Sequence, residues 1–330
     1  MLLYDRGLSV LEQYGLTAKS SYRGRGALLC QTEKGLLILR EFHGSEKRLE
    51  KQREILLQIQ RQSKEKVDQI LVNQGGELIS VDKEGIPYIV KMWYEGRECD
   101  TRSREDVIRS VETLARLHNV MKLPVCEMYT AEPLDQEYQR HNAQLRRIQK
   151  FIRKKGVENA FEKIFLSSVD WFLERGRTAV QSLENSDYQK LRNQAVAAGC
   201  VCHGEYNQHN VLMMRNSVAV TNFEKWSFDM PVADLYRFMR KVLEKNNWDV
   251  DLARKMLRAY HRQRNLSQEE LENLRIRFVY PEKYWKLGNY YFTHRKTWVS
   301  GKSVEKIQRL VDQKELWKEF EKKCFEKLEI

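Results

Sequence analysis

The chain has 330 residues, of which 42% are hydrophobic and 32% are charged, and its formal charge is +12. This composition supplies a sizeable core and excludes a disordered polypeptide, and the length suits one large domain or two lobes. No apolar stretch reaches the ~18 residues that a membrane-spanning helix needs, and the first residues lack the pattern of a signal peptide. The positive charge favours anionic partners, but it is spread along the chain, so nucleic acid is disfavoured.

The six cysteines form no CxxC pair. Their spacing offers neither a disulfide framework nor a recognisable zinc site. We therefore expect reduced thiols and a cytosolic folding compartment.

The N-terminal part of the chain alternates between apolar and polar residues, with turn residues between the runs. This pattern predicts strands over residues 21–30, 35–42, 77–81 and 87–93, and a helix over residues 45–62. In that helix, the apolar stripe through Leu49 and Leu56 points Gln52 inward. The two glycines of residues 21–26 (SYRGRG) fit a phosphate-binding loop, or more simply a hairpin turn.

The rest of the chain reads mainly as helix. One helix is expected to begin after Thr101 or Ser103, which are N-cap residues, and to bury a stripe that includes Val107 and Leu114. A short strand pair is expected near residues 200–224, and further helices over residues 135–195, 232–260, 267–275 and 281–330. A sheet followed by helices predicts an α+β fold of two unlike lobes, residues 1–93 and residues 94–330.

Three short motifs follow one another in the second lobe. They are His203-Gly204-Glu205 with Asn210 five positions after Glu205, then Thr221-Asn222-Phe223-Glu224, then Ala233-Asp234-Leu235. In this order and at these spacings they resemble the active-site block of aminoglycoside and choline kinases. The resemblance implies a protein-kinase-like fold with a small antiparallel N-lobe sheet plus a helix, and a larger helical C-lobe. It also implies phosphoryl transfer with ATP and Mg²⁺ as cofactors.

The resemblance assigns roles to these residues. Glu205 and Asn210 take the catalytic positions, and Asn210, Asn222 and Glu224 take the metal-binding positions. Asp234 is expected to bond backbone near the catalytic loop. Glu205 is one methylene longer than the family's aspartate, and a misplacement of ~1 Å can cost roughly 100-fold in rate. Asn222 is neutral where a hard cation prefers a carboxylate, so we expect weak or lost transfer.

The nucleotide side is altered too. Arg40 stands where the family has its phosphate-anchoring lysine, although a surface arginine at a strand edge fits equally well. With Gln52 facing inward, the usual lysine–glutamate ion pair is expected to be absent. Tyr88, Met92 and Glu95 lie in a hinge-like strand whose backbone would meet an adenine ring; a plain lobe boundary is the alternative.

Two histidines have structural roles in this interpretation. His118, in a segment that resembles the family's L-A-x-L-H helix, is expected to be a packed core residue. His203 is expected to orient the catalytic loop without acting as a base.

Within this superfamily the likeness is strongest to the CotS-type spore coat proteins. It rests on residues 88–100, 202–211, 221–240 and 280–291. Membership implies synthesis in the mother-cell cytoplasm, placement in the spore coat and other coat proteins as partners. The leading hypothesis is a kinase-like protein of coat assembly or structure with weak or lost activity. An active ATP- and Mg²⁺-dependent kinase of a small molecule, sugar or coat protein is the second, and a basic nucleic-acid-binding module is the third.

Overall fold

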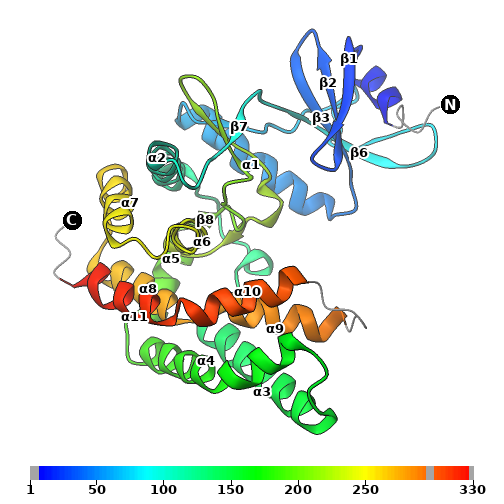
Figure 1. Cartoon of the computed structure of the whole chain (residues 1–330). Helices are drawn as coiled ribbons and strands as arrows, with labels where there is room; N and C mark the ends of the chain where they lie inside the picture. The colour runs from blue at the N-terminus through cyan, green and yellow to red at the C-terminus, as the bar shows by residue number, and fades with distance from the viewer. Residues whose placement is uncertain (1–6, 295–300, 327–330) are drawn as a thin grey trace.

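The computed structural model describes residues 7–294 and 301–326 (Figure 1). Its N-lobe contains an antiparallel sheet in the order β1-β2-β3-β6-β5, next to helix α1 (Glu46–Gln62) and the short helix η1 (Leu8–Tyr14). The strands are β1 (Ser20–Gly24), β2 (Ala27–Thr32), β3 (Gly35–Glu41), β5 (Ser80–Val81) and β6 (Pro87–Met92). The predicted small N-lobe sheet with one helix is therefore confirmed.

The predicted single strand over residues 21–30 is wrong. The hairpin turn, the simpler of the two interpretations of residues 21–26, is confirmed instead, because Arg25 and Gly26 both have positive φ, at 55° and 69°, between the paired strands β1 and β2. Positive φ at two central residues is the geometry of a tight type I′ turn, and the glycine makes it accessible. The strand expected over residues 77–81 is also shorter, because only Ser80–Val81 pairs with β6.

The two faces of the N-lobe sheet meet different neighbours, since side chains alternate along each strand. On the outer face, Leu37, Tyr88 and Val90 pack with residues of η1. On the inner face, Leu29, Ile38 and other residues pack with Trp93 and with two residues of the C-lobe, Leu212 and Ala219. The inner face is thus the one that meets the second lobe.

The C-lobe is mainly helical. Its helices are α2 (Arg104–Val120), η2 (Glu127–Tyr129), α3 (Leu134–Lys155), α4 (Ala160–Glu184), α5 (Tyr188–Ala197), η3 (Phe223–Lys225), α6 (Val232–Leu243), α7 (Val250–Gln263), α8 (Gln268–Val279), α9 (Glu282–His294), α10 (Gly301–Asp312) and α11 (Lys314–Phe325). In Figure 1 the sheet lies at the upper right, and α3 and α4 lie at the opposite end of the molecule. None of the described helices has the length and apolar character needed to cross a bilayer.

Short strands connect the two lobes. β4 (Lys66–Val67), β10 (Val218–Val220), β9 (Val211–Met213) and β7 (Arg97–Glu98) form one sheet in that order, and β8 (Val201–Cys202) pairs with β11 (Ser227–Phe228). β4 follows α1 directly, yet it pairs in parallel with β10 of the C-lobe. This pairing brings the segment after β4 against the segment after β10, where the candidate site lies.

The helix that begins near residue 103 agrees with its prediction. Ser103 caps α2 by accepting a hydrogen bond from the Asp106 backbone, and Val107 and Leu114 are fully buried. The single helix expected over residues 232–260 is wrong, because α6 and α7 are separate. Asn247 and Trp248 have positive φ, at 48° and 58°, which no continuous helix allows.

Candidate active site

The catalytic-loop backbone is held by Asp234 at the start of α6. Its Oδ2 accepts a hydrogen bond from the His203 backbone (2.5 Å), and its Oδ1 accepts one from the Gly204 backbone (2.9 Å). His118 on α2 lies between Asp234 Oδ2 (3.4 Å) and the Tyr260 hydroxyl (2.7 Å). Burial would raise the pKa of Asp234, but the hydrogen bond with His118 and the nearby charge of Arg237 outweigh it and the pKa is lowered. Asp234 thus bonds the loop backbone, and His118 is the packed core residue that the sequence predicted.

His203 connects the loop to the Thr221–Glu224 motif, which follows β10. Its Nδ1 accepts the Glu205 backbone N–H (3.1 Å), and its Nε2 donates to the Thr221 carbonyl (3.0 Å). Gly204 has φ 79°, and a Cβ there would lie 1.9 Å from the Lys225 carbonyl oxygen. The loop is therefore fixed, and it leaves the Glu205 side chain exposed at its end.

Asn210 links the Thr221–Glu224 motif to the loop by two hydrogen bonds. Asn210 Nδ2 donates to the Glu205 carbonyl (2.9 Å), and Asn210 Oδ1 accepts from Asn222 Nδ2 (2.7 Å). Asn222 has φ 67° and ψ 59°, a left-handed conformation that asparagine tolerates. The structure thus brings Glu205, Asn210 and Asn222 together, with an amide-to-amide hydrogen bond between the last two.

A buried ion cluster that the sequence did not reveal lies next to Asn222. Lys91 on β6 has a side chain that is 1% exposed; its Nζ lies 3.2 Å from Asp68 Oδ2 and also donates to Glu224. Asp68 is fully buried and accepts the Asn222 backbone N–H (2.9 Å). Burial favours the neutral amine, but Asp68 and Glu224 outweigh it and raise the pKa of Lys91. Lys91 therefore stays charged, and Glu224 is already bound to it.

The carboxylates of this cluster shift in opposite directions. Burial raises the pKa of Asp68, more than Lys91 lowers it. Burial also favours the neutral form of Glu224, but its contact with Lys91 prevails and its pKa is lowered. Glu224 is thus the firmer anionic partner of Lys91.

Arg40 does not take part in an ion pair within the part of the chain that the structure describes. Its guanidinium lies 6.0 Å from the centre of the Trp93 ring, and Arg25 lies 5.7 Å from the same ring. Gln52 is buried, as the helical period predicted, and its Nε2 has no hydrogen-bond partner. The ring of Trp93 thus lies near both arginines on the inner face of the sheet.

The remaining residues of the predicted nucleotide site do not converge with Asn210. The side chains of Tyr88 and Met92 pack on the outer face of the sheet, so only their backbone could meet a nucleotide between the lobes. The Met92 and Trp93 N–H groups donate to the carbonyls of Gln69 and Leu36, both at 2.8 Å. Glu95 is exposed.

A family model described as "Spore coat putative kinase YutH" matches residues 8–324. The chain belongs to this family. A curated relative, spore coat protein S of Bacillus subtilis (strain 168), is 25% identical over 160 residues. That alignment covers 48% of this chain and 46% of the relative, so it spans about half of each protein.

The solved structures that resemble this YutH-family chain show its fold. An aminoglycoside phosphotransferase from Alicyclobacillus acidocaldarius has a TM-score of 0.86 at 17% identity, over 97% of this chain and 95% of that one. Spectinomycin phosphotransferase APH(9)-Ia, bound to AMP, has a TM-score of 0.64 at 12% identity over 98% of both chains. Choline kinase LicA from Streptococcus pneumoniae has a TM-score of 0.54 at 14% identity, over 96% and 97%. The protein-kinase-like, bilobal fold is thereby confirmed.

Nucleotide and Mg²⁺ are the groups that this fold implies, so the residues around Asn222 can be tested for their fit to Mg²⁺. A hard divalent cation prefers several free carboxylate oxygens in a near-octahedral arrangement. Here Asn222 is neutral, Asn210 Oδ1 is taken by Asn222, and Asp68 and Glu224 are both bound to Lys91. The residues present do not fit a Mg²⁺ ion of the usual kinase type.

Proposed function

We propose that this chain is a CotS-type, kinase-like spore coat protein that acts in coat assembly through binding and transfers phosphate weakly or not at all. The observation that carries the proposal is the Asn222 amide at the metal-holding position, hydrogen-bonded to the oxygen of Asn210. Phosphoryl transfer depends on metal ions that neutralise charge on the phosphates. The Asn222 amide is neutral and supplies no negative charge to hold such a metal ion, and its hydrogen bond also occupies the Asn210 oxygen.

The inner face of the N-lobe supports the same proposal. An adenine ring needs apolar walls from both lobes that stand apart. Leu29 and Ile38 of the N-lobe and Leu212 of the C-lobe belong to one packed cluster with Trp93, and each is at most 5% exposed. These walls are covered by each other and by the indole.

The direct test of lost nucleotide binding is thermal unfolding with and without Mg²⁺ and ATP. A ligand at 100 times its Kd adds about 2.7 kcal/mol to the stability of the native state and raises its melting temperature. We expect no rise for the wild type. Asn222→Asp restores the carboxylate, and Asn216→Asp, in the exposed turn between β9 and β10, is the matched control. A rise in the wild type comparable to that of an active kinase would contradict the proposal.

The coat role is tested in a spore-forming host. A deletion strain should make spores with altered coat composition, and Glu205→Gln should restore it as well as the wild-type gene does, because binding and not transfer is at work. Normal coat composition and resistance in the deletion strain would overturn the assembly role. Failure of Glu205→Gln alone, with a folded protein, would favour catalysis.

An active kinase is the second candidate, and the intact loop scaffold of His203 and Asp234 favours it. Glu205 would then accept the substrate hydroxyl proton, and Asn210 and Glu224 would hold the metal. Purified protein incubated with γ-labelled ATP and a coat extract should then label an acceptor. Absence of Mg²⁺-dependent transfer would end this candidate.

A further inference from the structure

Lys91 is a cation placed deep between the two lobes by strand pairing. It lies opposite Ile38 in the ladder of β3 and β6, so its side chain projects from the inner face of the sheet. Its neighbours on β6, Val90 and Met92, project from the outer face. The Lys91 ammonium therefore points toward the segments that lie between the sheet and the C-lobe.

The ammonium joins three segments that are far apart in the sequence. Asp68 lies 23 residues away on the segment after β4, and Glu224 lies 133 residues away on η3. Asp68 in turn holds the backbone of Asn222, the residue at the metal-holding position. Lys91 therefore reaches the same motif that a metal would contact, and it does so from the N-lobe.

The surroundings of Lys91 are those of a cation site. Besides the bound carboxylate oxygens, Asp68 Oδ1 and Asn222 Oδ1 are buried oxygens without a hydrogen-bond partner. Oxygen ligands of this kind are what hard cations require. The cation that the Asp68 and Glu224 carboxylates of this cluster bind is the ammonium of Lys91 on β6.

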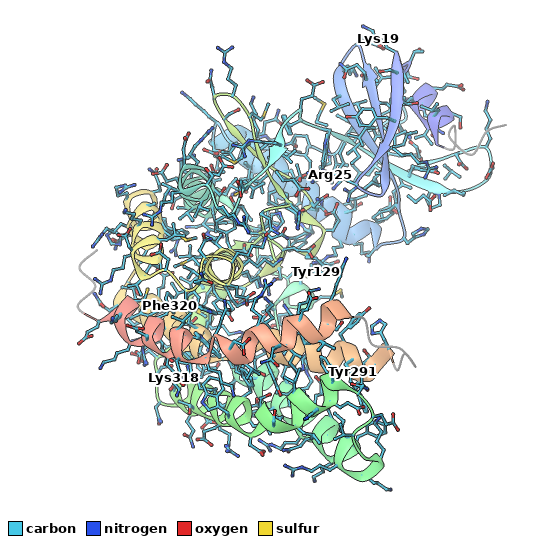
Figure 2. All side chains as sticks on the ribbon, in the orientation of Figure 1. Lys19, Arg25, Tyr129, Tyr291, Lys318 and Phe320 are labelled. Atoms are coloured by element: carbon cyan, nitrogen blue, oxygen red, sulfur yellow. The ribbon has the colours of Figure 1, made fainter. Side chains whose placement is uncertain are left out.

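We propose that the Lys91 ammonium is a tethered cation in the place of the metal, and that it holds the two lobes closed without nucleotide or metal. Three further contacts fit a closure built into the chain. Arg48 of α1 donates to the carbonyls of Glu224 (3.3 Å) and Trp226. Arg25, at the end of the β1–β2 hairpin on the side toward the C-lobe (Figure 2), donates to the His209 carbonyl at 2.6 Å. The Trp93 ring fills the apolar space between the lobes.

The proposal yields an effect that a merely structural lysine would not produce. Removing the ammonium leaves the fully buried Asp68 carboxylate and the 39% exposed Glu224 carboxylate without their cation. A buried charge without a partner, here that of Asp68, is strongly unfavourable. An added divalent ion relieves this charge if the oxygens around Lys91 form a cation site. A lysine that only fills space would leave no such affinity.

The experiment is a Mn²⁺ titration of the full chain, followed by electron paramagnetic resonance and by melting temperature. The wild type should show no saturable Mn²⁺ binding and no change with EDTA. Lys91→Met should bind one Mn²⁺ and melt higher with Mn²⁺ than with EDTA. Lys91→Met with Asp68→Asn should lose the gain, and Lys34→Met, in the exposed turn before β3, is the matched control.

Saturable binding of one Mn²⁺ by the wild type would overturn the proposal, as would a folded Lys91→Met that binds none. If Lys91→Met does not fold, small-angle scattering of the wild type decides. Its radius of gyration should be the same in EDTA and in Mg²⁺ with ATP, whereas compaction on ligand addition would overturn ligand-free closure. These measurements need no coat partner, so they succeed or fail separately from the proposed coat role.

Discussion

The segment His203–Asn210, the predicted catalytic loop, and the segment Thr221–Glu224, the predicted metal-binding segment, are joined by the hydrogen bond between Asn210 and Asn222, yet they differ in how well they match the kinase motifs. In the loop, His203, Gly204 and Asp234 make the backbone contacts that fix its course. In the segment Thr221–Glu224, Asn222 is an amide bonded to Asn210, and Lys91 of the other lobe places its ammonium against Glu224 and Asp68. The comparison separates the demands of the fold, which are backbone hydrogen bonds, from those of phosphoryl transfer, which are charges placed for a metal.

The largest expected effect comes from a substitution that disrupts the backbone contacts of the loop. Asp234→Ala removes the acceptor of two buried N–H groups and the partner of His118. A buried donor left unsatisfied costs about 1–3 kcal/mol, so we expect a loss of roughly 3–5 kcal/mol in the free energy of unfolding. Urea denaturation followed by circular dichroism measures it.

Glu205→Ala is the control for this variant, because its side chain is exposed on the same loop. It should change the free energy of unfolding by no more than about 0.5 kcal/mol. A cost below about 1 kcal/mol for Asp234→Ala would mean that the loop does not depend on this carboxylate for its course.

The two sides also differ in how far the sequence revealed them. His203, Asn210 and Asp234 could be placed because their motifs follow one another at fixed spacings within one stretch of chain. Asp68 and Lys91 belong to no such motif, and they meet Asn222 only because β4 pairs with β10. One signal was available: Lys91 is a lone charge in an apolar strand, on the same side as Ile38 and Trp93.

The overall architecture was easier to predict than its boundaries. Periodicity gave α1 and α2 because each buries one regular stripe. The glycines of residues 21–26 indicated the hairpin turn at Arg25, but periodicity missed the break at Asn247, which also needs Trp248 in the left-handed region, where tryptophan gives no sequence signal. The role of Arg40 could not be settled either, because its neighbours, the ring of Trp93 and the charges of Lys91 and Glu224, lie on segments far from it in the sequence.

A smaller effect is expected when the pH is lowered, because His118 supports the loop through Asp234. Burial lowers the pKa of His118 below its ordinary value of 6.5, so the ring is neutral in the native state. As the pH falls below 6.5, the unfolded chain binds a proton that the native state does not, and stability decreases. The loss in the free energy of unfolding between pH 7.5 and pH 5.5 is at most about 1.4 kcal/mol, the value for a ring that takes up no proton in the native state.

The measurement is the free energy of unfolding at pH 7.5 and at pH 5.5, for the wild type and for His118→Gln. The variant loses the Asp234 and Tyr260 contacts at both pH values, so only the difference between the two pH values is compared. That difference should be smaller in the variant. An equal loss in both proteins would show that the acid sensitivity arises elsewhere.

The smallest expected effect tests whether the lobes are held by the buried ammonium or by the hairpin at the surface. Arg25 pairs with Glu98 at 2.8 Å, but both side chains are partly exposed, at 27% and 41%. Exposed ion pairs contribute about 0.2–1 kcal/mol and are screened by salt, with a Debye length of about 3 Å at 1 M. Arg25→Ala should therefore cost less than about 1 kcal/mol, and less again at 1 M NaCl. Arg102→Ala, at an exposed site before α2, is the matched control. If Arg25→Ala instead cost more than about 2 kcal/mol at both salt concentrations, the hairpin and not Lys91 would hold the lobes together. Only a contact shielded from solvent resists screening by salt.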